Sequence, residues 1–344
     1  MSTKVGGVAP DKHNYPTPRQ TLDAAYCSQI LTVQQADFRV GQLTVDALHD
    51  KISKLWGHLL PDGAANASSP AYRAWLSYFI TNGFGYGTAH AWVRALIRCP
   101  GRFLATENSL AFRLVPENFD EHGEIVTGSI GGEPEVDRDG NIILRDNINY
   151  VRRVWDVCAN RVIPRCWVPQ QTVEPVSHAW VHNDDLQYTW SPVNNFLWTL
   201  PLPQGSNIAQ IREELIAYGV EYSWLDVLCL RQPLPTSMPT VSVPLGVEIQ
   251  QAREERRVKE WETDVPLIGG VYVTGGRVIT YLNGLGRAYH PEVDWEHERS
   301  WLRRAWTLQE TVGIDRMAIA GMQQGALHPL APEVRFHSFR RWYR

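Results

Sequence analysis

The stretch Tyr222-Ser223-Trp224-Leu225-Asp226-Val227-Leu228-Cys229-Leu230 decides how this chain folds. A short and nearly continuous apolar run of this kind is typical of a strand that is buried on both faces. Similar runs at residues 173–180, 277–282 and 317–320 predict three more strands. Strands buried on both faces belong to parallel sheets that are covered by helices.

Helical patterns separate these strands along the chain. Apolar side chains at helical spacing predict a helix over 208–218, with Ser206 or Asn207 as its N-cap and Gly219 at its end. Further helices are expected at 249–262, 265–273 and 297–312. The alternation of strands and helices predicts an α/β fold, in which right-handed crossovers connect the strands of a parallel sheet.

The first third of the chain has a different, mostly helical pattern over residues 21–105. A glycine run divides two of its helical segments, at Gly83, Gly85 and Gly87. No strand precedes this run and no Gly-Lys-Ser/Thr follows it, so a helix–helix turn is favoured over a phosphate loop. Asp139-Gly140, between two short apolar pairs, predicts a hairpin within 115–145.

Four segments are therefore expected: a tail at 1–20, a mostly helical N-terminal extension at 21–145, an α/β domain at 146–325 and a basic aromatic tail at 326–344. With 344 residues and 44% hydrophobic content, the chain can bury more than one core. Lys and Arg number 33 against 37 Asp and Glu, so no excess of cations favours nucleic acid as a partner.

Cellular location and redox state follow from what the sequence lacks. No uncharged window of 18 apolar residues predicts a membrane span, and no apolar segment near Met1 resembles a secretion signal. The five cysteines form no Cys-x-x-Cys pair, which argues against a disulfide framework or a structural zinc site. We expect a soluble cytoplasmic protein with reduced thiols and no cofactor.

Ligands of open parallel sheets bind at the carboxyl ends of the strands. The first expected strand ends in Ser177, His178 and Trp180, and the second contains Asp226. A carboxylate inside an apolar strand is costly unless it is paired. Asp226 is therefore either a structural anchor, which is the favoured interpretation, or a ligand-binding group.

The helix expected at 297–312 has two distinct faces. Its apolar stripe comprises Trp301, Ala305, Leu308 and Val312. The opposite stripe comprises Arg299, Arg303, Trp306 and Glu310, where a Trp one turn before a Glu fits either a pocket wall or a covered contact.

Other chemistries have weaker support. His178 and His182 would need a helix to share a metal, Cys229 in a buried strand is usually inert, and Gly284-Leu285-Gly286 is a lone Gly-x-Gly. No Gly-x-Ser-x-Gly motif indicates a serine hydrolase.

Three blocks of the sequence resemble the fungal heterokaryon-incompatibility (HET) domain, in order and spacing. They are Val176-Ser177-His178-Ala179-Trp180, the block Tyr222–Gln232 with its Tyr-x-Trp-Leu-Asp-x-Leu-Cys-Leu-x-Gln pattern, and Arg304-Ala305-Trp306-Thr307-Leu308-Gln309-Glu310. The resemblance covers about residues 150–321. In the first block the sequence departs from the family, because His178 stands where many members have Tyr and no Gly follows Trp180.

The resemblance implies a role in self/non-self recognition and programmed cell death. HET domains are considered distant relatives of TIR domains, many of which cleave NAD+ with a Glu four residues after a Trp. This relation implies a TIR-like (flavodoxin-like) fold, Glu310 as the catalytic residue and NAD+ as the substrate. It also implies substrate binding by Ser177, His178, Trp180, Asp226, Arg303 and Trp306.

The alternative is a non-catalytic signalling module that acts by self-association or by binding a protein partner. In that case Trp224, Trp306 and Leu308 would be core residues, and Asp226 and Glu310 would anchor ion pairs. The resemblance to TIR enzymes, which often need oligomerisation to complete the site, implies a homo-oligomer, and a protein partner in incompatibility signalling is the other expected partner.

Overall fold

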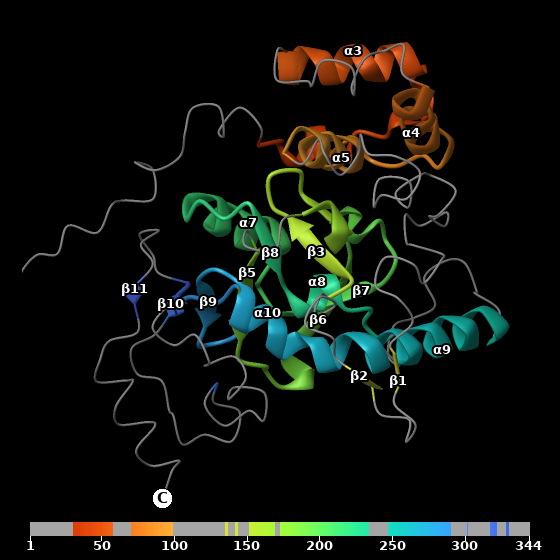
Figure 1. Cartoon of the computed structure of the whole chain (residues 1–344). Helices are drawn as coiled ribbons and strands as arrows, with labels where there is room; N and C mark the ends of the chain where they lie inside the picture. Colours follow the sequence, from red (N-terminus) through yellow and green to blue (C-terminus); the bar gives the residue numbers. More distant parts are fainter. Residues whose placement is uncertain are drawn as a thin grey trace, which may run out of the picture.

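The computed structural model of the chain describes residues 30–57, 70–98, 135–136, 142–143, 151–168, 173–233, 247–289, 301, 317–321 and 328–329. Within these residues the chain forms an α/β fold, in which helices surround a seven-stranded sheet (Figure 1). A smaller group of helices from the N-terminal part of the chain lies at one end of this sheet (Figure 1).

Four parallel strands form the centre of the sheet, in the order β8 (Tyr222–Trp224), β5 (Val173–His178), β9 (Val278–Tyr281) and β10 (Met317–Ile319). Antiparallel strands extend it on both sides. β3 (Arg153–Asp156) pairs with β8 and with β4 (Arg161–Pro164), and β11 (His328–Pro329) pairs with β10. The parallel α/β sheet expected from the sequence is thus confirmed in its central four strands.

The expected strand over 222–230 is wrong in its second half. β8 ends at Trp224, and a short helix, α8 (Asp226–Cys229), follows it. The amides of Leu228 and Cys229 donate to the carbonyl of Leu225, and the carboxylate of Asp226 accepts from the amide of Val227. The run is apolar because this turn is buried, and hydrophobicity alone does not distinguish a buried turn from a buried strand.

The helices between the strands match the sequence pattern. α7 (Ile208–Ala217) begins at the N-cap Asn207, whose side chain accepts from the amide of Gln210, and Gly219 follows it with a φ of 76°. α9 (Val247–Asp264), η11 (Val265–Leu267) and α10 (Ile268–Thr274) lead into β9. Of the helix expected at 297–312, only Trp301 lies within the described residues.

Two hairpins accompany the sheet. β1 (Glu135–Val136) pairs with β2 (Ile142–Ile143), as the intervening Asp-Gly predicts. The second, β6 (Leu186–Trp190) and β7 (Thr199–Pro203), was not expected from the sequence. Its loop contains two consecutive left-handed residues, Asn195 and Phe196, which turn the chain back.

The N-terminal segment is helical, as expected. It contains α2 (Val33–Asp37), α3 (Val45–Trp56), α4 (Pro70–Thr81) and α5 (Tyr86–Arg98), and a short 3-10 turn, η2 (Val40–Gln42). Gly83 and Gly85 of the glycine run lie in the turn between α4 and α5, and Gly87 is the second residue of α5. A Cβ on Gly87 would lie 2.4 Å from the carbonyl oxygen of Ala159, so this glycine allows the helix to approach the sheet instead of holding a phosphate.

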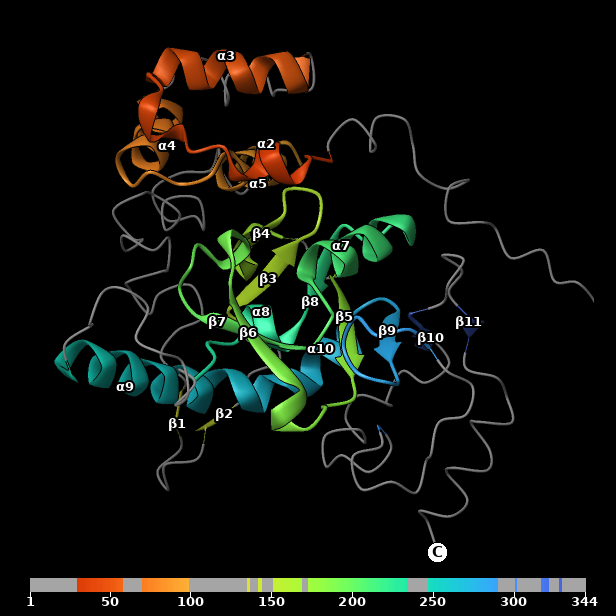
Figure 2. The same ribbon diagram turned by 180° about the vertical axis from the view of Figure 1, so that it is seen from behind.

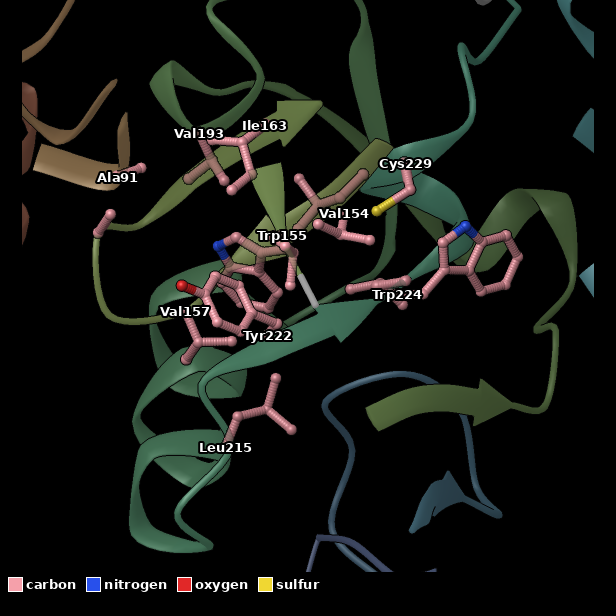
Figure 3. Packing of buried hydrophobic residues seen from close by; sticks show 14 of the residues in the cluster. Ala91, Val154, Trp155, Val157, Ile163, Val193, Leu215, Tyr222, Trp224 and Cys229 are labelled. Carbon is pink, nitrogen blue, oxygen red and sulfur yellow. The ribbon is translucent and has the colours of Figure 1, made fainter. Parts of the chain in front are cut away.

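Figure 3 shows where the N-terminal helices and the sheet share a core. Trp155 of β3 and Tyr222 of β8 pack together, Leu215 approaches from α7, and Ala91 comes from α5. All four are buried. In Figure 2 the β5 arrow points away from α2–α5, so these helices cover the amino ends of the parallel strands. The carboxyl ends lie on the other side of the sheet.

Candidate functional site

The strand order places a topological switch point between β5 and β9. The connection from β5 leads to β8 on one side, and the connection from β9 leads to β10 on the other. This order is compatible with a flavodoxin-like fold, in which ligands bind in the crevice outside the carboxyl ends of the strands.

The structure brings His178, Trp180 and Asp226 together at these carboxyl ends. His178 is the last residue of β5, and Asp226 begins the turn that follows β8. The Nε2 atom of His178 lies 2.9 Å from Oδ1 of Asp226. The ring of Trp180 lies against the imidazole, with 5.2 Å between ring centroids and a tilt of 41°.

Asp226 is held by its own turn as well as by the histidine. Its Oδ1 accepts from the amide of Val227 at 2.7 Å, and its backbone carbonyl accepts from Nε2 of Gln232 at 3.1 Å. The side chain remains 17% exposed. Asp226 is therefore an anchor for the turn, as the favoured interpretation predicted, and it also retains contact with solvent.

Ser177 faces a different neighbour from His178. Its hydroxyl accepts from the indole N–H of Trp301 at 2.6 Å, and both side chains are buried. In the sheet register Ser177 is opposite Thr280 of β9, which is also fully buried. Trp301, expected on the apolar stripe of its helix, therefore covers β5 close to the switch point.

A carboxylate that sequence reasoning missed lies beside the same strand ends. Glu214 of α7 accepts from the hydroxyls of Tyr281 and Tyr218, at 2.6 Å and 2.8 Å, and from the amide of Gly321 at 2.5 Å. Burial and the neighbouring Glu214 raise the pKa of the Tyr281 phenol. Glu214 thus joins α7 to β9 and to the end of β10. The spacing of Glu214 and Tyr218, one helical turn apart, was the available sequence signal.

The weaker candidates are not assembled into sites. His182 is half-exposed and contacts Asp184 at 3.1 Å, away from the His178 pair. Burial raises the pKa of the Cys229 thiol to about 12, which keeps it protonated and unreactive. Across the described ranges, no three His, Cys, Asp or Glu side chains gather as metal ligands would.

Arg303, Trp306 and Glu310 lie outside the described residues. Four of the seven residues expected in the site, Ser177, His178, Trp180 and Asp226, are thus placed at the carboxyl ends of neighbouring strands. None of the helices in the described part of the chain has the length and hydropathy of a membrane span. Comparisons of the chain with family models, with curated proteins and with solved structures gave no match.

Proposed function

We propose that this chain is a HET-domain protein and that the carboxyl ends of β5, β8 and β9 form a TIR-like site that cleaves NAD+. One observation carries the proposal. His178 and Asp226, from two of the blocks that resemble the family, meet at the carboxyl ends of β5 and β8, next to the topological switch point between β5 and β9. The protein would be a cytoplasmic effector of programmed cell death after self/non-self recognition, and it would act as a homo-oligomer or with a protein partner.

The reaction would need one well-placed carboxylate and no cofactor. Glu310 would face the nicotinamide ribose and stabilise the positive charge that develops on the sugar as the bond breaks. Nicotinamide would leave with the bonding electron pair. Water would then add to the anomeric carbon and release a proton, which gives ADP-ribose.

The remaining site residues would bind the substrate. Trp180 or Trp306 would stack on a ring of the dinucleotide, because an aromatic face suits a flat ring system. Asp226 and Arg303 would orient neighbouring groups or the diphosphate. The half-buried position of Trp180 beside His178 supports this role, because it leaves part of the indole in contact with solvent.

The test is nicotinamide release from NAD+ by the purified full chain at high protein concentration. We expect Glu310→Gln to lower the rate by about 10²–10³-fold, the usual cost of removing one stabilising group in an active site. The matched control is Glu255→Gln on the exposed part of α9, which makes the same chemical change and should leave the rate unchanged. Thermal melts establish that each variant is folded.

A wild-type chain that is folded and oligomeric but releases no nicotinamide would exclude the NAD+ reaction. The non-catalytic signalling module would then be favoured. It already has one observation in its support, because the contacts of Asp226 with Val227 and His178 are internal to the fold. In that case Glu310→Gln should kill cells as well as the wild type does on expression, with no fall in cellular NAD+.

A further inference from the structure

We propose that the outer edge of β6, the edge that faces away from β7, is an interface at which two copies of this chain pair as antiparallel strands. β6 and β7 form a two-stranded sheet of their own, separate from the seven-stranded sheet. Figure 2 shows β6 in the foreground of the molecule. Among the described residues, no strand pairs with the outer edge of β6.

The prolines of β7 determine which backbone groups of β6 lie on its outer edge. Leu186 is opposite Pro203, and Tyr188 is opposite Pro201. Proline has no N–H, so neither pair can exchange the two hydrogen bonds of a hydrogen-bonded pair. Such pairs alternate along an antiparallel ladder with pairs whose backbone groups point away from the partner strand. The N–H and C=O groups of Leu186, Tyr188 and Trp190 therefore point away from β7.

A hydrogen bond next to the ladder supports this assignment. The amide of Gln204 donates to the carbonyl of Asp185 at 2.7 Å, so position 185 belongs to the pairs that bond to the β7 strand. The alternation then makes Gln187 and Thr189 the residues of β6 that bond to β7. In the described part of the chain, no hydrogen bond reaches the outward backbone groups of β6.

The two strands of the hairpin differ in how their outer edges are protected. Proteins usually block the edge of a sheet with proline or charged side chains, which prevents pairing with another chain. The outer edge of β7 lacks N–H groups at Pro201 and Pro203, and the whole strand is buried. The sequence of β6, Leu-Gln-Tyr-Thr-Trp, has no proline and no charge, and none of its residues is buried. β6 is therefore the edge that remains open to pairing.

A second copy of β6 fits this edge in one antiparallel register, with a two-fold axis at Tyr188. In this register Tyr188 is opposite its own counterpart, and Leu186 is opposite Trp190 of the second copy. Outward backbone groups then meet outward backbone groups, so each pair can exchange both of its hydrogen bonds. Aromatic pairs and pairs of aromatic with aliphatic side chains stabilise neighbouring strands, and the uncharged strands do not repel each other.

The charges beside β6 also favour a second copy as the occupant. The exposed Asp184 and Asp185 come directly before the strand. At the other end, the exposed Arg39 lies over the ring of Phe196 in the loop after β6, 5.5 Å from its centroid. Antiparallel pairing places the acidic end of each copy beside the end that carries Arg39 in the other copy. Parallel pairing would bring the two acidic ends together.

The proposed contact is small, because β6 has only 5 residues, so we expect a dimer that forms in a concentration-dependent way. The inference names the contact of the homo-oligomer in the proposed function. It does not depend on the NAD+ reaction, and its test uses no NAD+, so the two proposals can fail separately.

The test is sedimentation velocity of the full chain between about 1 and 100 µM, the range in which small interfaces associate. We expect the wild type to form dimers and Tyr188→Lys to weaken them about 10-fold, because it places two like charges opposite each other at the two-fold axis. The control is Thr189→Lys, which adds the same charge at an exposed residue that is opposite Gln187 of the second copy. It should weaken the dimer much less. A mixture of Tyr188→Lys and Tyr188→Glu should restore dimers, because opposite charges then meet.

A second variant tests the register without a change of charge. In a hydrogen-bonded antiparallel pair the two Cα atoms are about 5.5 Å apart, a separation that a disulfide can span. Mild oxidation should therefore link Tyr188→Cys into a covalent dimer. Thr189→Cys and the wild type should give little of this product, because residue 189 is not opposite itself.

Two results would overturn the proposal. A wild-type chain that remains monomeric up to about 100 µM would leave the outer edge of β6 to an extended segment of another protein. A dimer that Tyr188→Lys and Thr189→Lys weaken equally would have its contact elsewhere on the chain. Thermal melts establish that each variant is folded.

Discussion

Charged side chains have different roles at the amino ends and at the carboxyl ends of the parallel strands. At the amino ends of the strands, three buried arginines connect the N-terminal part of the chain to the α/β part. At the carboxyl ends, His178 contacts Asp226 beside the half-buried Trp180. The first arrangement joins elements far apart in the sequence, whereas the second joins the ends of two neighbouring strands.

Ion pairs and hydrogen bonds of three arginines hold the N-terminal part at the amino ends of the strands. Arg94 of α5 contacts Asp156 at 2.5 Å and Glu221 at 2.9 Å. Arg161 of β4 reaches the carboxylate of Asp37 at 2.7 Å, and Arg212 of α7 donates to the carbonyl of Leu31 at 2.7 Å. Arg94 and Arg161 join N-terminal helices to the sheet, and Arg212 joins α7 to the segment just before α2. The N-terminal helices are therefore part of the fold, at the end of the parallel strands opposite the candidate site.

Removing one of the buried arginines at the amino ends of the strands should have the largest effect on stability. Arg94 and Asp156 are both fully buried, so Arg94→Leu leaves an uncompensated carboxylate in the interior. We expect a loss of about 3–5 kcal/mol in the free energy of unfolding, measured with urea. The control is Arg73→Leu in the exposed pair Arg73–Asp46, which should cost about 0–1 kcal/mol.

A variant at the carboxyl ends of the strands provides the comparison for this free energy of unfolding. Ser177→Ala removes the acceptor of the buried Trp301 indole, and the loss of one partner of a buried hydrogen bond costs about 1–3 kcal/mol. If Ser177→Ala destabilised the chain as much as Arg94→Leu, the two ends of the strands would not differ in their contribution to stability.

A second change tests how closely α5 must approach the sheet. Alanine in place of glycine inside a helix normally stabilises it by about 1 kcal/mol. At Gly87 the new Cβ would lie 2.4 Å from the backbone oxygen of Ala159, so we expect Gly87→Ala to destabilise by about 1–3 kcal/mol instead. The measurement is the melting temperature.

Gly276→Ala serves as the control for Gly87→Ala. Its Cβ would lie 3.0 Å from a side-chain carbon of Glu174 instead of 2.4 Å from a backbone oxygen, so the melting temperature should change less. A stabilising Gly87→Ala would show that the helix is not docked as closely as described.

The smallest expected effect concerns pH and Glu174, at the amino end of β5. Burial raises the pKa of Glu174, against the opposing effect of its hydrogen bonds from Arg277. The folded chain therefore binds this proton more tightly than the unfolded chain, and the contribution to stability grows as the pH falls. The difference in unfolding free energy, wild type minus Glu174→Gln, should therefore increase as the pH is lowered from about 7 to about 4.

Glu254 on the exposed face of α9 should behave in the opposite way. The hydrogen bond from Arg257 lowers the pKa of Glu254, so its contribution to stability is lost as the pH falls. The corresponding difference for Glu254→Gln should therefore decrease over the same range. Equal slopes for the two variants would contradict the role given to burial.

The sequence by itself determined most of the local structure. The apolar runs before His178, at 277–282 and at 317–320 form strands, Asn207 and Gly219 bound α7, and the glycine run marks the turn between α4 and α5. These predictions succeeded because local periodicity and capping chemistry act within a few residues. The expectation over 222–230 failed because a buried turn and a buried strand are equally apolar.

Only the tertiary structure decided which side chains meet. His178 and Asp226 are 48 residues apart, and Arg94 and Asp156 are 62 apart, so no local pattern could pair them. The sequence could identify Asp226 as a carboxylate in apolar surroundings that required a partner. The partner of Asp226, and the hydrogen bonds that Glu214 accepts from two tyrosines and a backbone amide, depend on the spatial order of the strands in the sheet.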